Sequence, residues 1–147
     1  MRRIYIGADS AGYELKGEVK NHLESLGYEV TDCGCDSAAS CHYPEFASRV
    51  CEKVQGDNDS FGILICGTGI GMSMCANKHK GIRAALCSDT YSAKMTRAHN
   101  DANLICLGAR VIGPCLALEI IDAFLSAEFE GGRHSIRLDM MAEIEKK

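Results

Sequence analysis

The sequence predicts an α/β fold: a doubly wound, Rossmann-like three-layer sandwich with a five-stranded parallel sheet and an extra C-terminal helix. Short apolar runs alternate along the chain with segments long enough to be helices, which is the order of repeated βαβ units. The run at residues 61–66 is apolar throughout, as expected of a central parallel strand covered by helices on both faces. No repeat or linker interrupts the pattern, so residues 1–147 are expected to form one domain.

The first half of the chain begins with a predicted strand at residues 4–7, which runs into a turn. A helix follows, and Gly27 is expected to cap its end. Its apolar residues share one face: Leu15, Val19, Leu23 and Leu26. The second strand is predicted at 28–30, and a helix beginning near Pro44 is expected to end at Gly56. That helix should bury Phe46, Ala47, Val50, Cys51 and Val54.

The second half continues the alternation, with strands predicted at 61–66, 82–87 and 103–107. Helices are expected through Met74 and Ala76 and from Thr90 to about Ala98. A further helix opens at Pro114, and its inward residues are predicted to be Leu116, Ile120, Ile121, Phe124 and Leu125. After a Gly-Gly pair, the last helix carries an apolar face suited to packing on a partner chain: Ile136, Met140, Met141 and Ile144.

Composition excludes several classes of protein. With 46% hydrophobic and 24% charged residues, the chain of 147 residues matches a globular domain rather than a disordered one. No apolar run approaches the roughly 20 residues of a membrane span, and the short N-terminal apolar stretch does not suit an export signal. The net charge of −4 and the scattered basic residues argue against nucleic acid as a partner, while a small anionic ligand stays possible. A cytoplasmic protein is therefore expected.

Nine cysteines are the unusual feature of the composition. Their odd number and their positions inside apolar runs favour free thiols that pack as small hydrophobic residues. No Cys-x-x-Cys pair is present, and the only cluster resembling a ligand set is Cys33, Cys35, Cys41 and His42. We expect no metal site there.

The segment Cys66-Gly67-Thr68-Gly69-Ile70-Gly71 is the most informative one, because ligands of such folds bind where the strands end. Its alternating glycines let backbone N–H groups gather around an anion, although a tight packing turn would use glycine in the same way. It lacks the Gly-Lys-Ser/Thr of a nucleotide-hydrolase phosphate loop and the third glycine of a dinucleotide fingerprint. Cys66 beside these amides could be a nucleophile or a general base, or simply a buried core cysteine.

Two further groups carry possible chemistry. His99 precedes the fifth predicted strand and could act as an acid or base, or merely cap a helix. Arg110 follows that strand, and Arg133 and Arg137 lie four residues apart, so that a helix would place both on one face. Such a pair suits a phosphate clamp, the alternative being a solvated charged face.

Together, these segments resemble the type B ribose-5-phosphate isomerase family, which includes galactose-6-phosphate and allose-6-phosphate isomerases. The resemblance extends from the first strand to the last helix. It rests on residues 7–9, 32–34, 43–44, 65–71, 76–78, 81–84, 99–103, 108–111 and 130–134.

The resemblance implies an aldose–ketose isomerase that uses no metal and no cofactor and works through a cis-enediolate. It implies that Cys66 is the general base, that the Thr68 hydroxyl and the loop of Gly67, Gly69, Ile70 and Gly71 stabilise the enediolate, and that His99 opens the furanose ring. The remaining residues are implied in binding the sugar or its phosphate: Asp9, Ser10, Tyr43, Asn100, Arg110, Arg133, His134 and Arg137. It also implies a homodimer or a dimer of dimers with the site between subunits, so that His99 and the 133–137 region act with residues of another chain.

Ser10 departs from the family pattern, which usually has histidine at this position. The substrate therefore stays open between ribose 5-phosphate and a six-carbon sugar phosphate. A non-catalytic sugar-phosphate-binding module is a further alternative, but it would need neither Cys66 nor His99. A redox role would require a second cysteine near Cys66.

Overall fold

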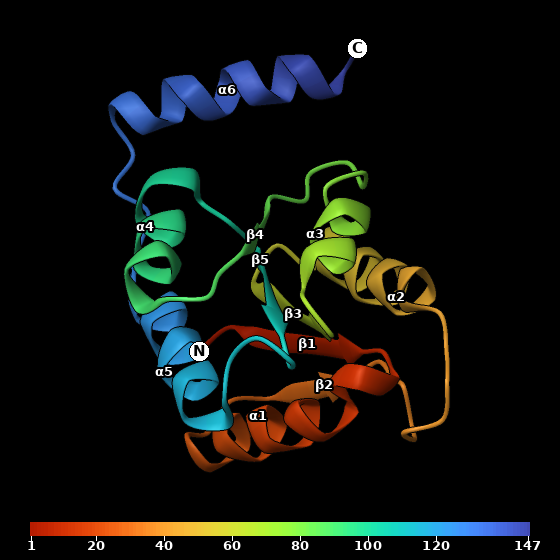
Figure 1. Ribbon diagram of the computed structural model, residues 1–147. Helices are drawn as coiled ribbons and strands as arrows, with labels where there is room; N and C mark the ends of the chain where they lie inside the picture. The colour runs from red at the N-terminus through yellow and green to blue at the C-terminus, as the bar shows by residue number, and fades with distance from the viewer.

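Five parallel strands form the centre of the computed structural model, which describes residues 1–147 (Figure 1). The strands are β1 (Arg3–Ala8), β2 (Val30–Asp32), β3 (Ser60–Cys66), β4 (Ala84–Leu86) and β5 (Leu104–Gly108). Their order in the sheet is β2-β1-β3-β5-β4, and every neighbouring pair is parallel. The predicted doubly wound sheet is confirmed.

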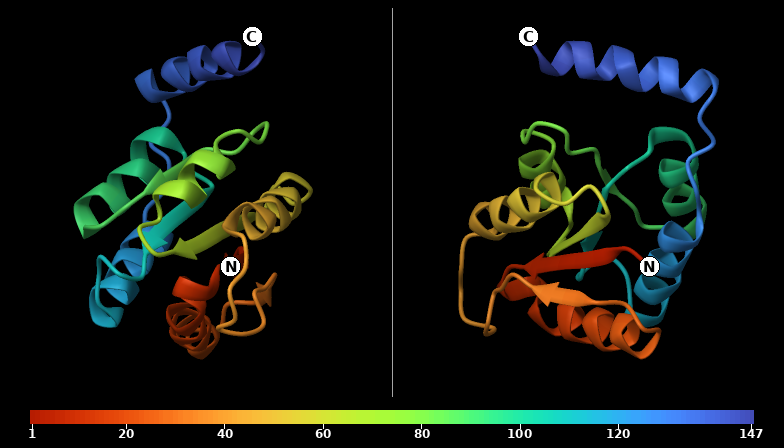
Figure 2. Two further views of the ribbon diagram at one scale, coloured as in Figure 1. Left: turned by 45° about the vertical axis from the view of Figure 1, so that its right-hand side comes forward. Right: turned by 180° about the vertical axis from the view of Figure 1, so that it is seen from behind.

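Helices cover both faces of the sheet (Figures 1 and 2). They are α1 (Tyr13–Ser25), α2 (Tyr43–Gln55), α3 (Ile70–Ala76), α4 (Thr90–Asn100), α5 (Pro114–Ser126) and α6 (Arg133–Glu145), with a short 3-10 turn, η1 (Ser10–Gly12), before α1. The helices α1, α4 and α5 pack on one face, and α2 and α3 pack on the other. The three-layer arrangement follows from this division.

The central strand β3 shows why the sequence forms this sandwich. All seven of its residues are buried, and successive side chains point to opposite faces. Ile63 and Ile65 join the core beneath α1 and α5, whereas Leu64 and Cys66 join the core beneath α2. An uninterrupted apolar strand is therefore stable only between two layers of helices.

Some element boundaries differ from the sequence prediction. The second strand begins at Val30 rather than at residue 28, because the Tyr28 amide donates to the Leu23 carbonyl and closes the end of α1. The fourth strand is shorter than 82–87, since the Ile82 amide bonds back to His79 in a turn. The fourth helix continues to Asn100, two residues beyond its predicted end.

Two apolar side chains predicted to be inward are exposed. Leu116 lies one residue before Ala117, which begins the buried stripe of α5, and is therefore turned about 100° away from that stripe. Leu26 forms the C-cap of α1, beyond the last turn that packs on the sheet. The apolar face predicted for α2 is buried throughout.

The C-terminal helix α6 lies apart from the sandwich, across one end of the molecule (Figures 1 and 2). Within its own chain it buries only His134, and its large apolar side chains are exposed: Ile136, Met140, Met141 and Ile144. A groove of about 510 Å³ separates its underside from β4 and the end of α4. No helix of the chain has the length and apolar character needed to cross a bilayer.

Candidate active site

The first group of predicted site residues lies at the carboxyl edge of the sheet, that is, where the parallel strands end. Asp9 follows β1, Cys66 ends β3, and Arg110 lies two residues beyond β5. These three strands are neighbours and run in parallel, so their ends meet at one edge. Residues that are far apart in the sequence therefore surround the loop at 67–71.

This loop turns back over the end of β5 and is held there by the backbone. The amides of Ala109 and Arg110 donate to the carbonyls of Cys66 and Gly67, at 2.9 and 3.0 Å. Gly69 has φ +79°, and a Cβ at this position would lie 2.5 Å from the Leu86 side chain and 2.9 Å from the Leu107 backbone. Only glycine therefore satisfies both the backbone conformation and the close packing.

The amides of the loop point to a role beyond packing. The Gly69 N–H donates to the Cys66 sulfur at 3.1 Å, and the Ile70 N–H donates to the Thr68 hydroxyl oxygen at 3.2 Å. The amides of Gly67 and Thr68 donate to no group of the protein. The loop thus pairs a thiol with free N–H donors, which is an arrangement suited to a base beside an oxyanion.

Cys66 differs from the other buried thiols in its surroundings. All nine cysteines are free, as predicted. Burial raises the pKa of Cys51 to about 12 and that of Cys87 to about 11, and it raises the pKa of Cys106 well above its usual range. These three thiols stay protonated within the core, whereas Cys66 accepts an amide hydrogen bond at the edge of the sheet.

Four other predicted residues line this edge. The Asp9 carboxylate accepts the Gly12 amide at 3.1 Å and so fixes the turn η1, in which Ser10 is partly buried. The exposed Tyr43 begins α2, and its ring covers the loop so closely that a Cβ on Gly71 would lie 2.6 Å from it. The exposed Arg110 places its guanidinium group beside Gly67.

The second group of predicted residues lies at the amino edge of the sheet, that is, where the parallel strands begin. Helix α4 runs from the carboxyl end of β4 back to the amino end of β5, so His99 and Asn100 in its last turn are far from Cys66 in the same chain. The exposed Arg133 and Arg137 and the buried His134 join them, because the segment before α6 is tied to α4. One chain therefore carries two separate groups of site residues.

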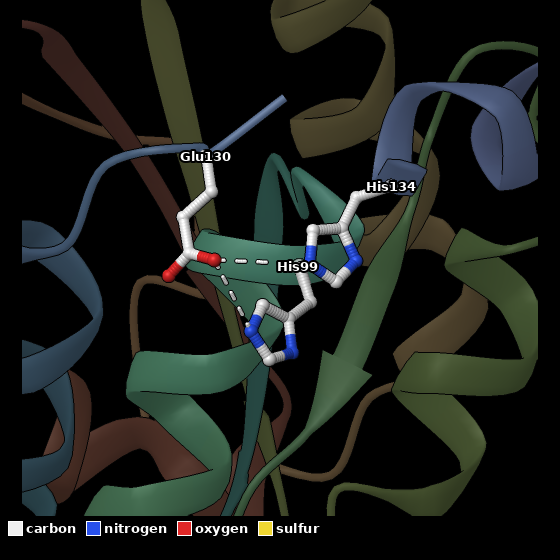
Figure 3. A group of neighbouring side chains, drawn as sticks. All are labelled: His99, Glu130 and His134. Atoms are coloured by element: carbon white, nitrogen blue, oxygen red, sulfur yellow. Dashed lines mark ion pairs between the residues drawn. The ribbon is translucent and has the colours of Figure 1, made fainter. Parts of the chain in front are cut away.

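At the amino edge, His99, Glu130 and His134 form a compact cluster (Figure 3). The imidazole rings are stacked, with centroids 4.2 Å apart and planes 10° apart. Oε1 of Glu130 lies 3.5 Å from Nε2 of His99 and 3.7 Å from Nε2 of His134. Burial and the nearby His99 lower the pKa of His134, and the positive charges of Arg133 and Arg137 act in the same direction.

The same cluster is the one place where three potential metal ligands lie within 4.8 Å of one another. Because the two rings are nearly parallel, however, the lone pairs of their nitrogens lie in parallel planes and do not converge on one point. The structure brings no three of Cys33, Cys35, Cys41 and His42 within ligand distance.

Glu130 is the member of this cluster that the sequence prediction did not name as a site residue. Its backbone N–H donates to the Ala98 carbonyl at 2.9 Å, which anchors the segment between α5 and α6 against α4. The only signal in the sequence was its position four residues before His134.

The chain is similar to known sugar-phosphate isomerases over nearly its whole length. Residues 4–141 match the family model described as "Ribose/Galactose Isomerase". The chain is 47% identical over 147 residues to ribose-5-phosphate isomerase B of Escherichia coli, which covers all of this chain and 99% of the relative.

Solved structures give the same result. The chain resembles ribose-5-phosphate isomerase B of Clostridium thermocellum with a TM-score of 0.95 and 50% identity, covering 98% of this chain and 97% of the other. It resembles the Mycoplasma genitalium isomerase with bound ribulose-5-phosphate with a TM-score of 0.94 and 41% identity, covering 99% and 97%.

Proposed function

The chain belongs to the ribose/galactose isomerase family, and from this premise we propose that it interconverts D-ribose 5-phosphate and D-ribulose 5-phosphate. One observation carries the proposal: the Cys66 thiol accepts an amide hydrogen bond beside two N–H groups that have no partner in the protein. A binding module would need the amides alone. An aldose–ketose isomerase also needs a base next to them.

In this reaction, Cys66 as thiolate removes the proton from C2 of the open-chain aldose. The electron pair of that bond forms the C1–C2 double bond of a cis-enediolate, and the negative charge moves to the oxygen on C1. The free amides of Gly67 and Thr68 stabilise this charge. Transfer of the O2 proton to O1, together with return of the proton from the thiol to C1, yields the ketose and regenerates the thiolate.

The other residues of the two groups bind and open the sugar. His99 takes the proton of the C1 hydroxyl of the furanose form and returns it to the ring oxygen, so that the ring C1–O bond breaks and the aldehyde becomes available. Arg133 and Arg137 lie one turn apart on α6, so both guanidinium groups are available to one phosphate, and Arg110 adds a third cation. Asp9, Ser10, Tyr43 and Asn100 contact the hydroxyl groups, and His134 supports the clamp.

We further propose a homodimer, or a dimer of dimers, in which each site combines two copies of the chain. The support is that Cys66 and His99 lie at opposite edges of the sheet in one chain, so they can act on one sugar only if they come from different copies. The exposed apolar residues of α6 and the groove beneath it supply a surface for such packing. Association would place the arginines of one copy over the loop of another.

Subunit complementation tests both proposals. The variants Cys66→Ala and His99→Asn should each lose turnover of ribose 5-phosphate as pure proteins. When equal amounts of the two are co-refolded, about half of the dimers are hetero-dimers, and each hetero-dimer has one intact site and one inactive site. About a quarter of the wild-type activity should therefore return. Hetero-dimers that form without activity would refute the shared site, and an undiminished Cys66→Ala enzyme would refute the mechanism.

A six-carbon sugar phosphate is the second candidate substrate, and Ser10 is the observation that favours it. A serine at the mouth of the site leaves more room than the histidine usual in the family. Comparison of kcat/KM for ribose 5-phosphate, allose 6-phosphate and galactose 6-phosphate distinguishes the candidates. The variant Ser10→His should shift the ratio toward the pentose if this position senses the length of the sugar.

A further inference from the structure

Glu130 faces both histidines of the amino-edge cluster with a single oxygen atom (Figure 3). Its backbone is fixed to α4 by the hydrogen bond to Ala98, and α4 also carries His99. The position of the carboxylate relative to His99 is thus built into the junction between two elements. The Glu130 side chain is 56% exposed, so this backbone anchor fixes where the carboxylate approaches His99.

The two histidines differ in what they can do with this carboxylate. His134 is only 7% exposed, and the lowered pKa keeps it neutral at pH 7. Its neighbours are His99, Arg133 and Arg137, which disfavour a proton there, and Glu130, which favours one. The His99 side chain is 36% exposed, and Figure 3 shows its second ring nitrogen turned away from Glu130.

We propose that Glu130 is a positioning residue for His99: its carboxylate holds the imidazole N–H on Nε2 and leaves the Nδ1 lone pair free to take the proton of the C1 hydroxyl, which it then returns to the ring oxygen. This inference rests on the proposed function, in which His99 opens the furanose. Stacking on the neutral His134 ring holds the imidazole plane in place. Glu130 itself exchanges no proton with the substrate.

The physical reason is that the tautomer of a neutral imidazole depends on the group that each ring nitrogen faces. A carboxylate accepts hydrogen bonds but cannot donate one when ionised, so it selects the tautomer with N–H toward itself. An amide in the same place can donate instead and can select the other tautomer. The neutral variant Glu130→Gln therefore keeps the shape of the side chain and removes the preference for the His99 tautomer with its proton on Nε2.

Two reactions, one on each of the two sugar phosphates, separate ring opening from proton transfer at carbon. Ribose 5-phosphate is mainly a closed ring, so its isomerisation needs His99. Ribulose 5-phosphate is an open chain, because its C5 hydroxyl carries the phosphate. The entry of solvent deuterium at C1 of ribulose 5-phosphate then reports on Cys66 alone. The matched control is Glu128→Gln, which changes an exposed glutamate two residues away in the same segment.

We expect Glu130→Gln and Glu130→Ala to lower kcat/KM for ribose 5-phosphate by about tenfold to a hundredfold, while deuterium entry into ribulose 5-phosphate changes less than about twofold. Nitrogen-15 NMR of the His99 ring should show a change of tautomer in both variants and none in Glu128→Gln. Equal loss of both reactions, or loss of neither, would overturn the proposal.

An unchanged His99 tautomer in Glu130→Ala overturns the proposal whatever the rates are. If the wild-type protein neither isomerises ribose 5-phosphate nor exchanges deuterium, the proposed function fails. The NMR measurement then still decides whether Glu130 positions His99, because it requires no substrate.

Discussion

The substitution Gly69→Ala tests whether the loop after β3 is held in place for chemistry. Gly69 has φ +79°, and its N–H donates to the Cys66 sulfur at 3.1 Å. Gly81 supplies a matched control, because its φ is +77° and a Cβ there meets nothing within 4 Å. The same substitution at both positions separates the cost of the backbone conformation from the cost of crowding.

The expected magnitudes follow from these two environments. Gly81→Ala should lower the free energy of unfolding by about 1 kcal/mol, the cost of alanine in a left-handed conformation. Gly69→Ala carries the same cost, and its Cβ also meets Leu107 backbone atoms at 2.9 and 3.0 Å. Because β5 is a buried strand, the loop has to move instead, and this movement adds about 1–3 kcal/mol to the loss in the free energy of unfolding.

Thermal unfolding and steady-state kinetics measure the result. Each kcal/mol corresponds to about 2–4 °C in Tm for a chain of this size. Movement of the loop also displaces the Gly69 amide from Cys66, so kcat should fall by about a hundredfold in Gly69→Ala and change little in Gly81→Ala. Equal Tm and equal kcat in the two variants would refute the assignment of this loop as a preorganised part of the site.

Three further predictions concern the phosphate clamp, the acid stability and the core. Arg137→Ala should raise KM by about tenfold or more with little change in kcat, because a phosphate contact is present in ground and transition states alike; an unchanged KM would remove Arg137 from the clamp. Asp57 accepts two hydrogen bonds from Arg3, at 2.5 and 2.6 Å, which hold the pKa of its carboxyl well below the usual range. A depressed carboxyl pKa stabilises the fold above the unfolded pKa of about 3.9 and loses that contribution as the pH falls through the folded pKa. The stability advantage of wild type over Asp57→Asn should therefore shrink in denaturant titrations below about pH 4, and a constant difference would contradict this reasoning. Phe124→Ala should cost about 3–5 kcal/mol, because Phe124 is fully buried and packs edge-on against Phe61 at 5.3 Å; a loss below about 1 kcal/mol would show that the core collapses around the gap.

Local patterns accounted for most of the fold. Alternation of apolar runs with amphipathic segments located all five strands and the major helices, because hydrophobic periodicity depends on neighbours in sequence. Two of the exceptions were Leu116 and the start of the second strand. Both depend on the phase of a helix relative to the sheet, or on hydrogen bonds that close a helix end, and neither is visible in a hydrophobic pattern.

The candidate site divides in the same way. The sequence by itself determined that Cys66 stands beside a glycine loop at the end of a buried strand, since these residues are consecutive. Only the tertiary structure decided that Tyr43 covers Gly71, that Glu130 faces His99, and that His99 lies at the opposite edge from Cys66. Such contacts join distant segments, and the packing of helices on the twisted sheet sets them rather than any pattern of neighbouring residues.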